Sequence, residues 1–260
     1  MWDEPRLLHT AANVLFALAL VLVVYAAGTV LANSPAFALH AIRVQGDLGH
    51  VSRGQIVEAL QGRVSGTFFT VDVEAIRSMF QAIPWVRRAE VRRRWPDRLE
   101  VKLEEHVVLA RWGQGAEGRL VNLYGEVFAG RVGSERGPER DAELPQFAGP
   151  AGSEHEVARR YALFRELLAP LSLEPHAVSL SQRQSWQARL SNGLTVQLGR
   201  DSEKDPVQER LARFVEVYPR TLGRMSRRFD YVDLRYPNGF ALRVPEILRS
   251  DPPKPTRRKA

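Results

Sequence analysis

One glycine-rich stretch has the spacing of loops that bind phosphate groups. Residues 113–118 read GQGAEG and fit the pattern G-x-G-x-x-G. In a dinucleotide site such a loop opens a helix, whose N-terminus then holds the pyrophosphate. Here the following residues, Leu120–Tyr124, favour a strand. We therefore expect residues 113–118 to form a hairpin loop rather than a cofactor site.

The residue types used most often in catalysis are not grouped in this chain. Glu104 and Glu105 are adjacent on an expected strand, so their side chains point to opposite faces and cannot act as a paired acid and base. The six histidines lack metal-ligand spacing, and no G-x-S-x-G motif occurs. The absence of cysteine excludes disulfides, thiolate metal sites and a cysteine nucleophile. We expect no enzyme activity, no cofactor and no bound metal.

A basic cluster is the remaining candidate for chemistry. Five arginines lie between Trp85 and Trp95. Aromatic rings among arginines can form a platform for nucleic acid. On a strand, however, alternate arginines point to opposite faces, and acidic neighbours can offset their charge: Glu90, Glu100 and Glu104. The pattern favours a solvated sheet face, while a partner-binding face and a nucleic-acid site stay open.

The composition predicts folded domains and leaves the partner open. The chain has 260 residues, of which 44% are apolar, so it can build one or two hydrophobic cores. It carries 37 basic and 30 acidic side chains, a net charge of +7. This excess suits nucleic acid or lipid headgroups. A chain without cysteine tolerates either redox compartment.

A long apolar segment near the N-terminus predicts a membrane anchor. Thr10–Ala32 contains no charged residue, and a helix of that length covers a hydrocarbon core of about 30 Å. A cleaved signal peptide is the alternative, because Ala36-Phe37-Ala38 resembles a cleavage site. The apolar segment is longer than the usual signal, and its start is nearly neutral. We expect a retained transmembrane helix over residues 10–32 behind a short start, residues 1–9; the basic residues do not decide its orientation.

Residues 38–106 have the pattern of one small α+β domain. The alternating segment Leu99–Glu105 predicts the second strand of an antiparallel hairpin. Ser52 and Asp72 are expected N-caps. The expected apolar helix faces consist of Ile56, Val57 and Leu60 after Ser52, and of Val73, Ile76 and Phe80 after Asp72. The expected strands are Ala41–Gln45, Trp85–Trp95 and Leu99–Glu105, the last two joined by Pro96-Asp97.

Residues 107–248 predict a mostly antiparallel sheet with helices on one face. The expected strands are Val107–Trp112, Arg119–Phe128, Trp186–Leu190, Leu194–Leu198, Phe229–Tyr236 and Phe240–Val244. A loop is expected over Ala129–Pro150, and helices over Ser153–Leu171 and from Asp205-Pro206 onward, with Asp205 as cap. Asn238-Gly239 is a strong hairpin-turn signal. Residues 249–260 are basic and proline-rich, so we expect disorder there.

Two blocks of the chain resemble one known family. Gly66–Gly113 closely resembles the POTRA domain and its exit in the FtsQ/DivIB family of bacterial cell-division proteins. Arg210–Leu222 and Tyr231–Leu242 are similar to the C-terminal part of the β domain of the same family. The order of anchor, POTRA domain, β domain and tail matches as well, so the resemblance extends over nearly all of Leu7–Val244.

This resemblance implies a non-enzymatic, single-pass scaffold of the division septum with a periplasmic body in the cell inner membrane. It implies a complex with FtsB and FtsL that helps to recruit and regulate FtsW and FtsI, with FtsK as a further candidate partner. Nucleic acid is not expected as a partner. The alternative is a membrane-anchored basic protein that binds nucleic acid or lipid headgroups, and its binding should weaken steeply with salt.

The resemblance also implies a partner-binding site at the last strand of the β domain, which in the family receives a strand from FtsB. Arg235 matches an arginine that meets an acidic residue of FtsB, and Tyr236 and Arg183 match further contact residues. Asn238 departs from the serine common in the family. The full set of expected partner-binding residues is Arg183, Tyr231, Arg235, Tyr236, Asn238, Gly239, Phe240, Ala241 and Leu242. For Tyr231, as for Trp186, ordinary packing is an equally good explanation.

Overall fold

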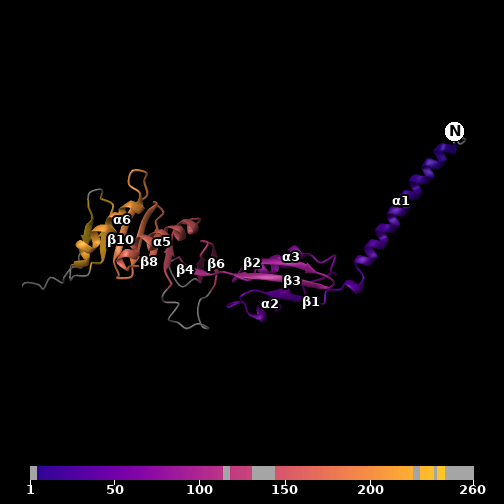
Figure 1. Ribbon diagram of the computed structural model, residues 1–260, viewed down its shortest axis with the longest axis horizontal. Coiled ribbons are helices and arrows are strands. Elements are labelled where there is room, and N and C mark those ends of the chain that lie inside the picture. The colour runs from indigo at the N-terminus through magenta and orange to yellow at the C-terminus, as the bar shows by residue number, and fades with distance from the viewer. Residues whose placement is uncertain (1–4, 114–117, 131–143, 225–228, 237–238, 244–260) are drawn as a thin grey trace, which may run out of the picture. The chain divides into compact units, whose positions relative to one another are not determined.

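A computed structural model describes residues 5–113, 118–130, 144–224, 229–236 and 239–243 (Figure 1). The chain divides into two compact units, residues 1–106 and 107–260. The predicted tail, residues 249–260, and Asn238 lie outside the described residues.

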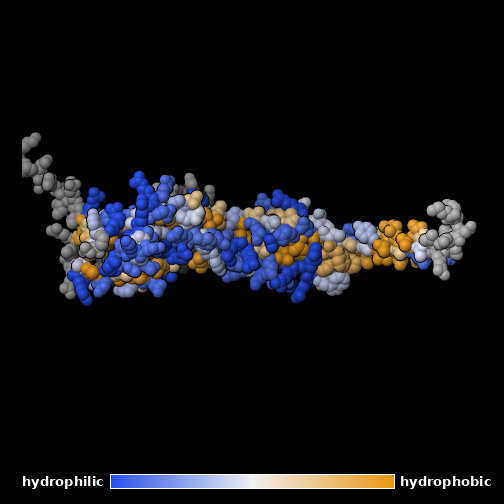
Figure 2. Space-filling view, turned by 90° about the horizontal axis from the view of Figure 1, so that it is seen from above, coloured by the Kyte–Doolittle hydropathy of each residue, from blue (hydrophilic) through white to orange (hydrophobic). Residues whose placement is uncertain are grey.

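The first unit begins with one long helix, α1 (Pro5–Ala32). Its segment His9–Ala32 has a mean hydropathy of 2.6 and is the one described helix that is long and apolar enough to cross a membrane. Figure 2 shows the apolar surface along α1. Its large apolar side chains are exposed on all sides, as the side chains of a lipid-embedded helix must be.

The rest of the first unit is a three-stranded sheet with two helices. A short 3-10 helix, η1 (Pro35–Phe37), leads into β1 (Ala41–Gln45). The other elements are α2 (Arg53–Leu60), α3 (Val73–Gln81), β2 (Val86–Arg94) and β3 (Arg98–Glu105). The strand order is β1-β3-β2, with β1 parallel and β2 antiparallel to β3. The last strand, β3, therefore lies in the middle of the sheet, between β1 and β2.

Local signals placed both helices correctly. Ser52 accepts a hydrogen bond from the Gln55 N–H in a capping box, and Asp72 accepts from the N–H groups of Glu74 and Ala75. On α3 the predicted Ile76 and Phe80 are buried. On α2 only Ile56 is fully buried, and Val57 is 54% exposed. The expected apolar face was therefore wrong at Val57, because this short helix contacts the unit along a narrow stripe.

The second unit is a nine-stranded mixed sheet. Its strands are β4 (Val108–Trp112), β5 (Arg119–Asn122), β6 (Val127–Ala129), β7 (Gln146–Ala148), β8 (Pro175–Leu180), β9 (Ser185–Leu190), β10 (Thr195–Arg200), β11 (Tyr231–Asp233) and β12 (Ala241–Arg243). The spatial order is β12-β11-β10-β9-β8-β7-β4-β5-β6. The pairs β4–β7, β7–β8 and β10–β11 are parallel and the others antiparallel. Most pairs are thus antiparallel, as expected.

Three expectations for this sheet were wrong. Arg119–Phe128 is not one strand but the hairpin β5–β6, because Asn122 and Glu126 close a tight turn around Gly125, whose φ is +78°. The expected loop Ala129–Pro150 contains β7, and β8 was not predicted. With three residues, of which Phe147 alone is buried, β7 is too short to show an alternating pattern.

Two helices cover one face of the sheet, as predicted. They are α5 (Glu154–Leu168), which continues into η2 (Ala169–Leu171), and α6 (Val207–Val217), followed by η3 (Tyr218–Arg220) and η4 (Leu222–Arg224). In Figure 1, α5 and α6 lie on the same side of the strands, and they contact each other. The predicted face of α5 is buried in the main core, including Phe164 and Leu168.

The cap of α6 differs from the prediction. The helix starts at Val207, and its N–H donates to Asp201 Oδ1 at 2.9 Å. Asp205 instead accepts hydrogen bonds from Arg210 and Arg213. An aspartate one residue before Pro206 was the obvious cap in sequence, but the loop brings Asp201 to the helix start.

Candidate functional site

The strand β12 forms one edge of the nine-stranded sheet. It pairs with β11 in the register Tyr231–Arg243, Val232–Leu242 and Asp233–Ala241. On its other side no strand pairs with it among the described residues. All three of its residues are exposed. An edge strand presents a row of N–H and C=O groups that a strand of another chain can pair with.

A groove of about 440 Å³ lies beside this edge, between α6 and the end of β11. Phe240 stands at one wall and packs edge-to-face on Phe214, with ring centroids 6.2 Å apart. Tyr236 lines the groove and is 56% exposed. The complete lining consists of Arg210, Arg213, Phe214, Val217, Leu234, Tyr236, Gly239 and Phe240. The groove therefore gathers three of the predicted partner-binding residues, which are Tyr236, Gly239 and Phe240.

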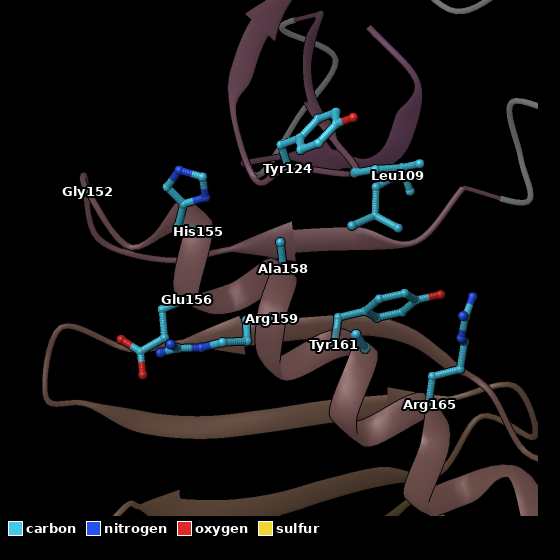
Figure 3. A pocket seen from close by; sticks show the side chains of 11 residues that line it. Leu109, Tyr124, Gly152, His155, Glu156, Ala158, Arg159, Tyr161 and Arg165 are labelled. Carbon is cyan, nitrogen blue, oxygen red and sulfur yellow. The ribbon is translucent and has the colours of Figure 1, made fainter.

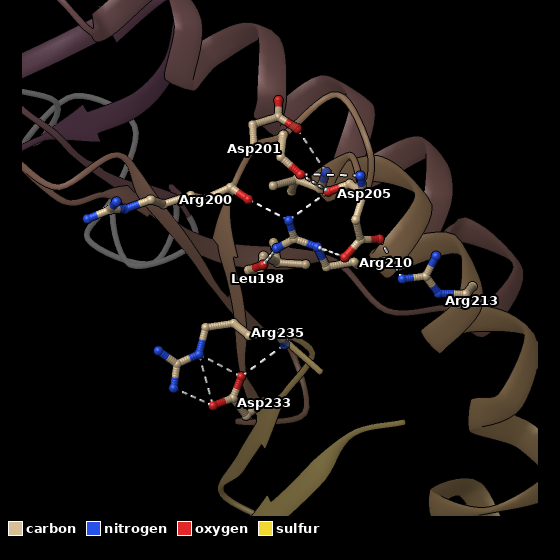
Figure 4. Close-up of polar contacts among 10 residues, drawn as sticks. Leu198, Arg200, Asp201, Asp205, Arg210, Arg213, Asp233 and Arg235 are labelled. Carbon is tan, nitrogen blue, oxygen red and sulfur yellow. Dashed lines mark hydrogen bonds and ion pairs between the residues drawn. The ribbon is translucent and has the colours of Figure 1, made fainter. Parts of the chain in front are cut away.

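Asp233 and Arg235 form a tight ion pair on the other face of the sheet (Figure 4). Arg235 Nε donates to both carboxylate oxygens, at 2.9 and 3.0 Å, and Nη2 donates to Oδ2 at 2.6 Å. The side chain of Asp233 is 7% exposed and that of Arg235 is 55% exposed. The hydrogen bond from Arg235 lowers the pKa of Asp233, and the same contact raises the pKa of Arg235. The pair holds the guanidinium at a defined place while leaving it accessible.

A buried arginine that the sequence analysis missed supports this region. Arg210 on α6 is 6% exposed and donates to the carbonyl oxygens of Leu198, Arg200 and Asp205. Its Nε also donates to Asp205 Oδ2 at 2.7 Å. Hydrogen bonding by Arg213 is the main reason that the pKa of Asp205 is lowered. The network ties the first turn of α6 to the end of β10 (Figure 4), so it fixes one wall of the groove.

The signal for Arg210 was present in the sequence. It follows Val207 by three residues and precedes Phe214 by four, so it belongs to the apolar stripe of α6. A charged residue on such a stripe must find partners when it is buried.

Gly199 connects the two arginine clusters. It lies at a β-bulge in β10 with φ of +79°. A Cβ atom at this position would lie 2.7 Å from Arg235 Cγ and 3.0 Å from Arg210 Nη1. Only a glycine lets both arginine side chains approach the backbone so closely.

The remaining predicted site residues are spread around this edge. Tyr231 is half-buried on the face that carries Asp233, where desolvation raises its pKa. Ala241 and Leu242 belong to β12 itself. Arg183 is exposed in the turn between β8 and β9, at the same end of the sheet as Arg235 but not in the groove. Trp186 is buried at 2% exposure, which supports the packing explanation for it.

A second groove, of about 570 Å³, lies along α5 (Figure 3). Figure 3 shows Tyr124 and Leu109 on the side of the groove facing α5, which contributes His155, Arg159 and Arg165. Gly125 permits the close approach of this turn to α5, since a Cβ there would lie 2.5 Å from His155 Nδ1. Nothing in the sequence analysis pointed to this groove.

The residues that the sequence offered as candidates for catalysis or for phosphate and metal binding have structural roles or do not group into a site. The strands on either side of the glycine-rich stretch, β4 and β5, pair antiparallel, while residues 114–117 of the predicted hairpin loop lie outside the described part. Glu104 pairs with Arg87, while Glu105 is a partly buried acceptor for the N–H groups of His50 and Val51. No group of three metal-ligating side chains occurs among the described residues.

The arginine cluster on β2 is largely occupied within the first unit. Arg87 contacts Glu104 at 2.8 Å, and Arg94 contacts Glu100 at 3.8 Å. Arg92 pairs with Glu90, and Arg93 donates to a backbone carbonyl oxygen. This pairing supports the solvated sheet face over a nucleic-acid platform.

Both units match models of known protein families. The family model described as "Cell division protein FtsQ/DivIB, C-terminal" matches residues 110–235, and "POTRA domain, FtsQ-type" matches residues 37–106. The chain is 45% identical to "Cell division protein FtsQ" of Burkholderia pseudomallei, covering 94% of both chains. It is 38% identical to the protein of that name in Nitrosospira multiformis, covering 94% of this chain and 99% of the relative. The α+β architecture, the two family matches and these identities over nearly the whole length show that the chain belongs to the FtsQ/DivIB family of cell-division proteins.

Proposed function

We propose that this divisome protein is a non-enzymatic scaffold that binds an FtsB strand at the edge of β12, within a complex that also contains FtsL. The observation that carries the proposal is the position of β12: an exposed edge strand beside a groove and an accessible arginine. Main-chain pairing would supply affinity, and the side chains around the edge would supply specificity.

The register of β11 and β12 predicts which types of side chain alternate along the incoming strand. Residues opposite each other share a face, so Leu242 lies on the face of buried Val232, and Ala241 lies on the face of Asp233. An added strand would alternate in the same way. Its side chains on the helix-covered face would point toward the groove and Phe240, and those on the other face toward Arg235. We expect apolar residues on the first face and an acidic residue on the second.

Arg235 can extend over the edge because its neighbour there is small. Ala241 lies opposite Asp233 and is exposed, so at this position of the register β12 places only a methyl group beside the ion pair. The large side chain of β12 on the same face, Arg243, lies two residues away, opposite Tyr231. The ion pair with Asp233 reduces the freedom that Arg235 would otherwise lose on binding, which is a form of preorganisation. Arg183 would be reached only by a partner that continues past β12 around the end of the sheet.

The proposal includes a membrane arrangement. We propose that α1 stays uncleaved and spans the cell inner membrane, with the N-terminus in the cytoplasm and residues 33–260 in the periplasm, at the division septum. The bound FtsB and FtsL would then help to recruit FtsW and FtsI and regulate septal peptidoglycan synthesis, and FtsK is a further candidate contact.

A site-specific photocrosslinker tests the strand addition. The chain offers a matched pair of positions: Leu242 on β12 is 37% exposed, and Val127 on β6, the opposite edge of the same sheet, is 36% exposed. We expect benzoylphenylalanine at position 242 to form an adduct with FtsB in dividing cells and the same residue at 127 to form none. An adduct at position 127 alone would place the binding site at the other edge of the sheet. If neither position forms an adduct, the proposed strand addition is wrong.

A further inference from the structure

An aromatic cluster lies where the chain leaves α1. Phe37, Phe68, Phe69 and Trp95 come from three separate segments. Phe37 and Phe69 have ring centroids 5.0 Å apart, Phe68 and Trp95 5.7 Å, and Phe37 and Trp95 6.0 Å. The four rings form one continuous apolar surface, which we call the exit cluster.

The exit cluster is not part of the hydrophobic core of the first unit. Core residues such as Phe80 and Leu99 are fully buried. In contrast, Phe69 is 48% exposed and Trp95 is 65% exposed. Large exposed aromatic side chains that gather at one place usually mark an interaction surface.

Backbone contacts hold the exit cluster at the end of α1. The Thr67 hydroxyl donates to the carbonyl oxygen of Ala32, the last residue of α1, at 2.5 Å. The Phe68 N–H donates to Phe37 O at 2.8 Å, and Ala38 and Thr67 form an isolated bridge. Phe37 follows Ala32 by five residues, so it lies within about 17 Å of it even in an extended chain. The loop that carries Phe68 and Phe69 is thereby tied to the membrane exit.

We infer that the exit cluster lies in the headgroup layer of the membrane that α1 crosses and seats the first unit on the bilayer. Tryptophan is enriched at this depth because its ring combines an apolar body with a polar N–H group. Phenylalanine rings beside it add apolar area that enters the boundary between headgroups and acyl chains. Two arginines stand beside Trp95: Arg94, 75% exposed and 3.8 Å from Glu100, and Arg98, 58% exposed and 3.5 Å from Asp97, so each keeps most of its side chain in solvent despite a loose ion pair. Their guanidinium groups are suited to lipid phosphates. The inference depends on α1 as a membrane span and is independent of FtsB binding.

Spin labelling of the full chain in a bilayer tests this location. Because the protein has no cysteine, a single cysteine can be introduced and labelled without removing others. Phe69→Cys reports on the exit cluster. Gln81→Cys, exposed at the end of α3, is the control. Both labelled proteins would be placed in nanodiscs of phosphatidylethanolamine and phosphatidylglycerol, and collisions with oxygen and with a water-soluble nickel complex would be measured.

We expect the label at 69 to collide with nickel at least about threefold less often than the label at 81, while its collisions with oxygen increase, since oxygen but not the polar complex enters lipid. Adding Trp95→Glu should raise nickel access at 69, whereas Val57→Glu on α2, where the native side chain is 54% exposed, should not. Equal nickel access at 69 and 81 would overturn the inference. Low access to both reagents at 69 would also overturn it, because it would mean burial against protein.

Discussion

Asp233 and Arg235 face each other at the end of β11 as a bidentate ion pair in which the carboxylate is nearly buried and the guanidinium is half exposed. The pair has an internal function, since it satisfies a buried acceptor, and it presents one cation beside an open sheet edge. A substitution at Arg235 therefore acts on folding and on binding together, and a second substitution at Asp233 separates the two effects.

Arg235→Glu should weaken FtsB binding by more than about tenfold, because the acidic partner side chain would lose its counter-charge and meet a like charge. Affinity would be measured with purified full-length protein in nanodiscs. Arg189→Glu is the control, an exposed arginine on β9 away from the edge. Asp233→Asn together with Arg235→Glu removes the repulsion inside the chain and should bind as poorly as the single variant. Wild-type affinity in the folded double variant would exclude Arg235 from the site.

The Asp233–Arg235 pair should make stability depend on pH in the acid range. The folded pKa of Asp233 lies below its unfolded value of about 3.9. Its contribution is therefore complete above pH 4 and is lost as the pH falls through the folded pKa. Thermal unfolding of wild type and Asp233→Asn should differ most at neutral pH, and the difference should shrink below pH 4. A constant difference between pH 7 and pH 3 would contradict this linkage.

Proline substitutions in β12 should separate main-chain from side-chain recognition. Proline has no N–H, and alternate N–H groups of an edge strand point outward. At least one folded variant among Phe240→Pro, Ala241→Pro and Leu242→Pro should lose FtsB binding and fail to complement a division defect. Phe240→Ala should reduce the affinity for FtsB less than the proline substitution that abolishes binding, unless the Phe240 ring is a main anchor of the partner in the groove. If every folded proline variant binds like wild type, the site uses side chains alone.

Gly199→Ala should destabilise the second unit more than Gly193→Ala. Both glycines have positive φ, +79° and +87°, so alanine costs about 1–2 kcal/mol of backbone strain at either position. At 199 the new methyl group would also meet Arg235 and Arg210, while at 193 it would meet nothing within 4 Å. We expect a lower Tm for Gly199→Ala than for Gly193→Ala, and weaker FtsB binding for Gly199→Ala alone. Equal Tm values would show that the arginines move aside freely.

The membrane arrangement can be tested by proteolysis. Protease added to spheroplasts should remove residues 33–260 and leave α1 protected. Complete protection of the body in intact spheroplasts would contradict a periplasmic location. Recovery of a mature N-terminus at Leu39 would identify a cleaved signal peptide instead.

Elements defined by local signals were predicted well. Asp72 caps α3 because its side chain reaches N–H groups two and three residues ahead. The hairpin β2–β3 follows from strict alternation, with Leu99, Val101 and Leu103 buried. α1 follows from length and apolar composition alone. In each case the deciding contacts lie within a few residues or along one face, so the sequence contains them.

Elements defined by distant contacts were not predicted. β7 exists because β4 and β8 supply partners on both sides. β1 lies beside β3 although the paired residues Ala41 and Arg98 are 57 residues apart in the chain. Asp201 caps α6 because a loop folds back over the helix start. Such pairings depend on which segments meet in space, and a single sequence does not contain that information.

The proposed partner-binding site likewise depends partly on the sequence and partly on the tertiary structure. Sequence resemblance alone supplied Arg183, Arg235, Tyr236 and the residues of β12 as expected contacts, and the sequence placed β12 last in the chain. Only the tertiary structure put β12 at the open edge, joined Phe240 to Phe214 across a groove, and paired Arg235 with Asp233 over Gly199. The physical reason is that an edge, a groove and a buried ion pair arise when segments far apart in the chain pack together.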